Sequence, residues 1–531
     1  MKIQFLSFRS IIILSIASFL IYIVFNKINN NTEIVKGKIL ADQYCSICHL
    51  SVSPDILPKQ SWESVLGYMG YWLGIDDISY LSDHPEFARI NVSARQEILK
   101  REGVFPDRPL VTSEDWRLIR NYFVSEAPEF ALEQNNKQEL NWFLPIFNNE
   151  PINYSSAPAV TTLVSINENK NNIYIGDGFA ATLSIMDDSG SFFSAPLAAE
   201  KPIYPVDIHV DQNIAYIASI GDLTATQPSK AGPAHIAKVD LSKEITADSF
   251  EVVLDDLYRM ADMNVLDLNN DDKLDFVVSG FGAVFGNLSW FESTDNGDYE
   301  EHTLLALPGV VKSEIYDFND DGLLDIMVLV SDAREGLHIL ENQGDNEFKL
   351  ITIFESHPAY GHTFFELADF NKDGNIDILV VNGDNVDSDP YNTNKSYHGL
   401  RIYINHNNYI FKEEFFYPMY GAFIAKTADF DDDNDLDIVA SSFYPDFSSE
   451  RMESFAYLEN NGDLSFKSYT NEAVMNGRWM TMDVGDIDGD SDIDVVLGGG
   501  YIPVGMFANM DLYEKMVRES PQLMILRNNL Y

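Results

Sequence analysis

An aspartate-rich run of nine residues occurs five times in the second half of the chain, and each copy begins and ends with Asp. The copies are Asp267–Asp275, Asp317–Asp325, Asp369–Asp377, Asp429–Asp437 and Asp486–Asp494. Successive copies start 50 to 60 residues apart, and each is followed at once by a short apolar, β-branched segment. A period of this length, with room for about four strands in each unit, predicts the blades of a β-propeller.

Two further units precede these five and lack the aspartates. They cover residues 163–185 and 206–239, and both keep a pattern of strand, Asn- or Asp-containing turn and strand. Five complete and two degenerate units predict seven blades, with six or eight as alternatives. The fold class expected is therefore multidomain, with a small all-α domain followed by an all-β propeller over residues 151–531.

The acidic runs carry oxygen side chains at positions 1, 3, 5 and 9, a spacing that can direct them inward around a tight turn. The candidate metal ligands are Asp267, Asn269, Asp271, Asp275, Asp317, Asn319, Asp321, Asp325, Asp369, Asn371, Asp373, Asp377, Asp429, Asp431, Asp433, Asp437, Asp486, Asp488, Asp490 and Asp494. Hard oxygen ligands of this number and charge favour Ca²⁺ over a transition metal. Simple acidic turns, without an ion, are the alternative.

An EF-hand loop starts in the same way but requires Glu at position 12 and a helix after the loop. Position 12 here is Val278, Val328, Val380, Ala440 or Leu497, and strands are expected to follow. The runs instead resemble FG-GAP or VCBS repeats, the family that includes the propeller of integrin α-subunits. That resemblance implies about five structural Ca²⁺ ions between strands of the blades.

The chain has two cysteines, and both fall in the motif Cys45-Ser-Ile-Cys48-His49. C-x-x-C-H is the attachment motif of c-type haem, in which two thiols bind the porphyrin and the histidine is the proximal iron ligand. A redox-active dithiol, a zinc half-site and a chance occurrence are the alternatives. A dithiol would need a βαβ setting, which is absent, and a zinc site would need further ligands nearby.

Residues 31–131 resemble a class I cytochrome c, with the motif after a first helix and Trp116 and Tyr122 on a final helix that Ser113 is expected to cap. In that family a Met ligand usually lies on a loop before the last helix, whereas this domain contains only Met69, expected on the helix after the motif. Met69 is therefore the candidate distal ligand, and His84 or an open site are alternatives. Met69 could equally be a core residue of an amphipathic helix.

The N-terminus has Lys2 and Arg9 before a mostly apolar stretch from Ile11 to Phe25. No small-residue cleavage site follows, so residues 1–30 are interpreted as an uncleaved signal anchor, with a cleaved signal peptide as the alternative. Either would export the rest, giving an inner-membrane protein that faces the periplasm, or a secreted or periplasmic one. Residues 132–150 are interpreted as a linker.

The formal net charge of −48 excludes nucleic acid as an expected partner. Loops rich in aromatic residues, His and Arg could line a binding mouth of the propeller or pack between blades: residues 382–391, 397–399, 416–420, 443–447 and 477–479. No catalytic constellation stands out, and we expect no catalytic residues. The sequence thus favours an electron-transfer protein whose propeller binds a redox partner, another protein or a polysaccharide. A periplasmic oxidoreductase that passes electrons from a propeller-bound substrate to the haem is the alternative.

Overall fold

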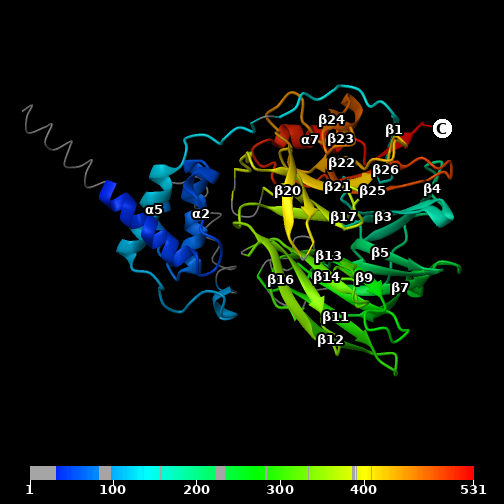
Figure 1. Cartoon of the computed structure of the whole chain (residues 1–531), viewed down its shortest axis with the longest axis horizontal. Coiled ribbons are helices and arrows are strands. Elements are labelled where there is room, and N and C mark those ends of the chain that lie inside the picture. Colours follow the sequence, from blue (N-terminus) through cyan, green and yellow to red (C-terminus); the bar gives the residue numbers. More distant parts are fainter. Residues whose placement is uncertain are drawn as a thin grey trace, which may run out of the picture. The chain divides into compact units, whose positions relative to one another are not determined.

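The computed structural model describes residues 31–82, 97, 99–135, 137–155, 158–221, 234–281, 284–332, 334–385, 389, 391–407 and 409–530. The chain divides into two compact units, Met1–Ala131 and Leu132–Tyr531. The first unit is helical and the second is built from β-sheets (Figure 1). No helix among the described residues is long and apolar enough to span a membrane, and residues 11–25 lie outside them.

The helical unit packs three helices around one apolar cluster. Residues 31–45 form the first helix, followed by α2 (Lys59–Trp72) and α5 (Ser113–Glu126), with short 3-10 turns at η1 (Pro54–Ile56) and η2 (Ser79–Leu81). The core includes Trp62 on α2 and Trp116 and Ile119 on α5. The cap of α5 is Thr112, whose hydroxyl accepts a hydrogen bond from Asp115 N at 3.1 Å, so the expected cap at Ser113 is wrong by one residue.

The first helix and α5 approach each other most closely at Gly37. A Cβ atom at this position would lie 2.3 Å from the carbonyl oxygen of Leu118 and 2.9 Å from the Cβ of Tyr122. Only glycine fits there, because any side chain would overlap the backbone of α5. Residue 37 therefore fixes how the helix that ends in the Cys45–His49 motif crosses the last helix.

The second unit contains seven antiparallel sheets, which we number as blades 1 to 7. Blade 1 has β2 (Thr161–Asn167), β3 (Asn172–Asp177) and β4 (Thr182–Asp187). Blade 2 has β5 (Pro205–Asp211), β6 (Ile214–Ser219), β7 (His235–Asp240) and β8 (Glu251–Leu254). Blade 3 has β9 (Met260–Leu266), β10 (Asp275–Gly280), β11 (Asn287–Ser293) and β12 (Tyr299–Leu305). Blade 4 has β13 (Val310–Tyr316), β14 (Asp325–Val330), β15 (Gly336–Asn342) and β16 (Phe348–Glu355).

Blade 5 has β17 (His362–Ala368), β18 (Asp377–Asn382), β19 (Gly399–Asn405) and β20 (Phe411–Pro418). Blade 6 has β21 (Ala422–Ala428), β22 (Asp437–Ser442), β23 (Phe455–Asn460) and β24 (Phe466–Tyr469), followed by the short helix α6 (Glu472–Met475). Blade 7 has β25 (Trp479–Gly485), β26 (Asp494–Gly499) and β27 (Leu523–Asn528), with helix α7 (Met510–Glu519) between the last two. The prediction of a seven-bladed propeller, with two blades that lack the Asp-rich run, is confirmed.

The first strand of each blade lies beside the first strands of the two neighbouring blades, from β2 through β5, β9, β13, β17 and β21 to β25 and back to β2. The apolar core lies between blades, as separate clusters that each join two neighbours. For example, Leu379 of blade 5 packs with Ile438 of blade 6, and Ile173 of blade 1 packs with Val496 of blade 7. The stability of the ring therefore comes from contacts between adjacent sheets, as blade-to-blade packing requires.

Blade 7 combines the two ends of this unit. Its outer strand is β1 (Phe147–Ile152), which pairs antiparallel with β27, and Phe147 lies opposite Asn528 (Figure 1). The last residues of the segment expected to be a linker therefore belong to the propeller. Earlier in that segment, the backbone N–H of Asn141 donates to the carbonyl oxygen of Ser468 at 2.9 Å.

Candidate functional site

The five Asp-rich runs each connect the first and second strands of a blade, in blades 3 to 7. We name them loops 3 to 7 after their blades: Asp267–Asp275, Asp317–Asp325, Asp369–Asp377, Asp429–Asp437 and Asp486–Asp494. In every loop the residue at position 6 has a positive φ, including the non-glycine residues Asp272 (65°) and Ser491 (83°). The tight turn therefore forms in all five loops, although Gly or Asn occupies position 6 in only three.

The side-chain carboxylate of the aspartate at position 1 stabilises the turn by accepting hydrogen bonds from backbone N–H groups of the loop. In loop 4 the two carboxylate oxygens of Asp317 accept hydrogen bonds from Asp321 N at 3.1 Å and Gly322 N at 2.8 Å. Loops 3, 5 and 6 repeat this pair of hydrogen bonds from positions 5 and 6. The carboxylate at position 5 likewise accepts from the N–H of position 7, as Asp321 does from Leu323 at 2.8 Å.

The aspartate at position 9 is buried in every loop, with an exposed fraction of 0%. It accepts a hydrogen bond, 2.7 to 2.8 Å long, from the backbone N–H of a residue at or near the end of the third strand. In blades 3 to 7 the donors are Ser293, Asn342, Asn405, Asn460 and Asn528. Burial raises the pKa of these carboxyl groups, to about 7 for Asp437 and about 6 for Asp325. Position 9 therefore joins the loop to the rest of its blade.

The donor set of the loops suits a hard cation. In loop 6, one oxygen each from Asp429, Asp431 and Asp433 lies within 4.8 Å of the others, and the same holds for Asp486, Asp488 and Asp490 in loop 7. Among the described residues, Oδ1 of Asp431 is buried and has no hydrogen-bond donor. Burial and the nearby Asp433 raise the pKa of Asp431. A buried carboxylate oxygen without a donor costs free energy, and a bound cation would remove that cost.

The Cys45–His49 motif lies at the end of the first helix. The backbone N–H groups of Cys48 and His49 both donate to the carbonyl oxygen of Cys45, at 3.3 and 3.4 Å, so the last turn of the helix continues through the motif. Both cysteines are free thiols, with Cys48 exposed and Cys45 partly buried. The side chains of Ile47 and Leu50 beside them are 57% and 43% exposed, which leaves apolar surface around the motif.

The protonation states of the motif follow from its surroundings. Burial, Asp42 and Cys48 raise the pKa of Cys45 to about 11, so its thiol stays protonated at neutral pH. Reactive cysteines of dithiol enzymes have lowered pKa values, so this environment disfavours the dithiol alternative. Burial lowers the pKa of His49, which favours the neutral imidazole that binds metals.

Met69 lies on α2 and packs against the same apolar cluster as Cys45. The two side chains therefore share one core, although no ligand fixes the role of Met69. His84 lies outside the described residues. The choice among Met69, His84 and an open site remains a prediction.

The aromatic and basic loops expected as a possible binding mouth are largely buried. Arg478 is fully buried and donates to the carbonyl oxygens of Phe443, Ile502 and Val504 at 2.5 to 2.7 Å. Trp479 is also buried and donates to Val474 O at 2.8 Å. These side chains hold neighbouring segments together and do not face solvent. They therefore support the alternative in which the loops pack between blades and do not line a binding mouth. Residues 386–388 and 390 of the first loop lie outside the described residues.

Charged side chains on the first strands form a cluster that the sequence analysis did not identify. Each first strand has a β-bulge in its pairing with the second strand, and Asp207, Asp262 and Lys312 lie at the bulges of blades 2, 3 and 4. Asp207 accepts a hydrogen bond from Met263 N at 3.0 Å, and Asp262 accepts one from Ser313 N at 2.9 Å, so each carboxylate joins its blade to the next. The available signal was a charged residue at the third position of each of these strands.

Together the sheets and loops define a seven-bladed β-propeller with Asp-rich turns in five consecutive blades. A family model described as an FG-GAP-like repeat matches residues 317–380, which include loops 4 and 5. A chain in a complex of S. cerevisiae Dbp5 with Nup159, Gle1, IP6 and ADP is 11% identical, covers 75% of this chain and 98% of its own, and has a TM-score of 0.38. A streptogramin B lyase is 12% identical, covers 72% of this chain and 98% of its own, and has a TM-score of 0.44. A search of curated proteins found no match.

Proposed function

We propose that this chain is an exported electron-transfer protein that carries covalent haem c on its helical unit and docks a partner through a calcium-stabilised propeller. The observation that carries the proposal is the pair of free thiols at Cys45 and Cys48, followed directly by His49 in the last turn of the first helix. Haem, when bound, supplies one-electron redox chemistry at its iron. The protein would attach it through both thiols and ligate its iron through His49, with Met69 as the proposed distal ligand.

The helical unit supports this assignment by its packing. The motif ends a helix that is fixed against α5 at Gly37, and Cys45 and Met69 adjoin the same apolar cluster. The apolar cluster beside Cys45 and the exposed side chains of Ile47 and Leu50 suit a flat, largely apolar ligand. Residues 1–30 lie outside the described residues, so export and the membrane anchor rest on the sequence of that segment.

Calcium is the second proposed cofactor, bound in the Asp-rich loops. The support is the converging carboxylates of loop 6, the buried Asp431 oxygen without a donor and the five similar turns. A divalent cation would offset the repulsion among the carboxylates and would stabilise the folded blades over the unfolded chain.

One observation favours the oxidoreductase as a second candidate. Asp207, Asp262 and Lys312 gather on adjacent first strands, where they are only partly exposed, and Lys312 lies 4.0 Å from Asp262. Partly enclosed charged groups of this kind can bind a polar ligand or substrate. The cofactor content of the purified protein separates the candidates, because a redox chromophore besides haem would favour the oxidoreductase.

The haem proposal is tested with the full chain produced alongside an active cytochrome c maturation system. We expect a Soret band that stays with the protein after acid-acetone extraction, and its loss in Cys45→Ser/Cys48→Ser. Ser46→Ala is a control, since Ser46 lies between the two cysteines but is neither a thiol nor an iron ligand, and its hydroxyl donates to the carbonyl oxygen of Asp42. A colourless wild-type protein would contradict the proposal.

Met69 is tested by its effect on the iron. Thioether ligation raises the reduction potential relative to histidine ligation. Met69→His should therefore lower the midpoint potential, and Met69→Ala should remove any sulfur-to-iron charge-transfer band. An unchanged spectrum in Met69→Ala would assign the distal position to another group.

A further inference from the structure

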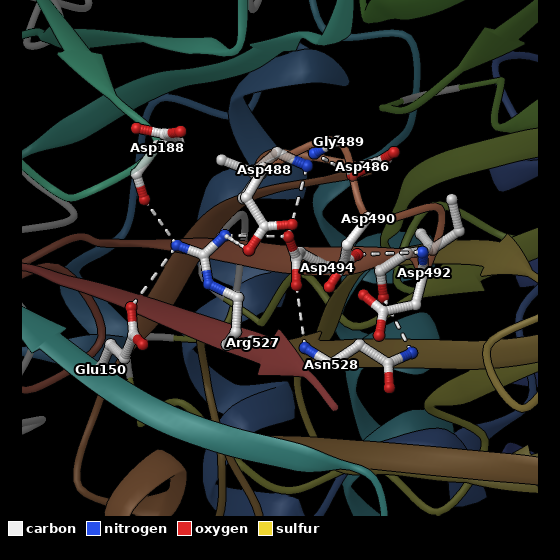
Figure 2. A network of polar contacts seen from close by, with 12 residues as sticks. Glu150, Asp188, Asp486, Asp488, Gly489, Asp490, Asp492, Asp494, Arg527 and Asn528 are labelled. Atoms are coloured by element: carbon white, nitrogen blue, oxygen red, sulfur yellow. Dashed lines mark hydrogen bonds and ion pairs between the residues drawn. The ribbon is translucent and has the colours of Figure 1, made fainter. Parts of the chain in front are cut away.

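In loop 7 an arginine from another strand of the blade is hydrogen-bonded to two of the loop's carboxylates, and one of these is the buried aspartate at position 9. Arg527, on β27, donates from Nη1 to Asp494 Oδ2 at 3.1 Å and to Asp488 Oδ2 at 3.3 Å (Figure 2). Its Nη2 donates to the carbonyl oxygen of Asp188 at 2.7 Å and lies 3.6 Å from Glu150 Oε2. The Arg527 side chain is only 12% exposed, so the guanidinium is enclosed by these groups.

The residue at the equivalent position of the other blades can be identified from a shared hydrogen bond. In each blade it immediately precedes the residue whose N–H donates to the aspartate at position 9. The residues are Glu292, Glu341, Ile404, Glu459 and Arg527 in blades 3 to 7. Three of the five are acidic, one is apolar and one is basic.

These equivalent side chains reach the same part of their loops. Glu292 accepts a hydrogen bond from Asn269 at position 3, at 2.9 Å, and the pKa of Glu341 is lowered by Lys349, by Tyr409 and, to a smaller extent, by Asn319, also at position 3. Glu459 lies close enough to Asp431, again at position 3, to influence it electrostatically. Blades 3, 4 and 6 therefore bring an additional carboxylate to the loop, whereas blade 7 brings a positive charge to Asp488 at the same position.

The backbone of loop 7 also departs from the common pattern. The aspartate at position 1 accepts from the N–H of position 5 in loops 3 to 6, but Asp486 accepts from Gly489 at position 4, at 2.7 Å. Basic side chains also touch two other loops, since Lys273 Nζ lies 3.0 Å from Asp271 in loop 3 and Lys372 Nζ lies 2.7 Å from Asp435 in loop 6. These lysines are 35% and 52% exposed and, among the described residues, contact no position 9 carboxylate, so their flexible side chains can move aside for an ion.

We propose that Arg527 takes the place of the cation in loop 7, so that the propeller binds four calcium ions, one in each of loops 3 to 6, and blade 7 closes without calcium. A guanidinium satisfies carboxylates through directed hydrogen bonds and keeps its charge at all accessible pH values. It also contacts β1, through Glu150, and blade 1, through Asp188, which a calcium ion held within the loop would not do. This inference rests on the proposed calcium binding and specifies its stoichiometry.

The experiment measures bound calcium per chain in matched variants at position 5 of two loops. Wild type should bind four ions, Asp373→Asn in loop 5 should bind three, and Asp490→Asn in loop 7 should still bind four. Both substitutions are nearly isosteric and lie at exposed turns, so the fold should be retained. Five ions in wild type, or loss of one ion in Asp490→Asn, would overturn the inference while leaving calcium binding intact. No bound calcium in wild type would overturn both.

A second variant tests Arg527 directly. Arg527→Gln removes the positive charge and leaves the carboxylates of Asp488 and Asp494 together, so a fifth ion should bind and chelation should lower the melting temperature more than in wild type. Arg518→Gln is the matched control, because Arg518 is 63% exposed on α7 and pairs only with Glu519 among the described residues. Four ions in both variants, with equal sensitivity to chelation, would contradict the role of Arg527.

Discussion

At the scale of single residues, the oxygen-bearing positions of the loops were predictable, and their partners were not. The spacing of Asp317, Asn319 and Asp321 is local, so the sequence alone indicated a turn lined with oxygen atoms. The pairing of Asp488 with Arg527 depends on a strand that follows a helical insertion, and no local pattern indicates it. The positive φ at Asp272 and Ser491 likewise depends on hydrogen bonds to position 1 rather than on residue type.

The buried aspartate at position 9 should stabilise its blade even without calcium. In Asp437→Ala, the Asn460 N–H and the Tyr457 hydroxyl would lose an acceptor at 2.8 Å. Unpaired buried donors of this kind cost roughly 1–3 kcal/mol each, so we expect a loss of about 2–4 kcal/mol in the free energy of unfolding. Denaturant unfolding of both proteins in the presence of a calcium chelator measures this loss. Asp463→Ala, at an exposed turn, is the control, and an equal loss there would contradict the assignment.

Gly37 should be essential to the packing of the helical unit. Gly37→Ala places a methyl group against the Leu118 carbonyl, and such overpacking costs roughly 1–3 kcal/mol. Thermal unfolding of Gly37→Ala, followed by circular dichroism at the helical band, should show a transition at a lower temperature than in wild type. Lys38→Ala, on the exposed side of the same helix, should leave it unchanged. A Gly37→Ala protein as stable as Lys38→Ala would show that the two helices can separate without cost.

At the scale of elements, the sequence indicated the repeating strands because each blade keeps its alternation and its turn. The strand that completes blade 7 was missed because it lies far from that blade in the sequence. β1 (Phe147–Ile152) reads Phe-Asn-Asn-Glu-Pro-Ile, which has little of the β-branched character of the other strands. Its pairing with β27 is a tertiary contact that overrides a weak local preference. The helical unit was expected from the resemblance of residues 31–131 to a class I cytochrome c, whereas haem attachment stays a prediction from the motif.

The contribution of β1 can be measured through one side chain. Phe147 is 4% exposed and packs against the rings of Phe430 and Tyr457 in blade 6. Phe147→Ala should therefore lower the free energy of unfolding by about 3–5 kcal/mol. Phe143, four residues before Phe147, is 56% exposed, and Phe143→Ala should lower the free energy of unfolding far less. Similar losses in both variants would show that β1 adds little to the ring.

At the scale of the whole molecule, charged residues of the first strands connect one blade to the next. Burial and the neighbouring Asp262 raise the pKa of Asp207 to about 7, although the nearby Lys312 acts in the opposite direction. Burial also raises the pKa of Glu366 to about 7. In the unfolded chain such carboxyl groups titrate near pH 4, so between about pH 4 and pH 7 the folded propeller binds more protons than the unfolded chain.

The propeller should therefore become less stable as the pH rises from about 5 to 7. Melting temperatures in saturating calcium measure this slope while the loop carboxylates stay charged. Asp207→Asn removes one of the titrating groups and should flatten the slope. Asp187→Asn should not, because the pKa of Asp187, at the end of β4, is lowered by Ser189 and Ser191 rather than raised. A slope unchanged in Asp207→Asn would place the pH dependence elsewhere in the molecule.

The pairing of Phe147 with Asn528 also has a consequence during synthesis, because it joins an early segment of the propeller to a late one. The outer strand of blade 7, β1, is synthesised before the other blades, and its partner β27 is synthesised after them. Until β27 has left the ribosome, β1 has no neighbour and β26 keeps an open edge, which another chain could pair with. A truncated or stalled chain would therefore carry several formed blades in an open arc, and a cell must shield that edge or complete β27 quickly.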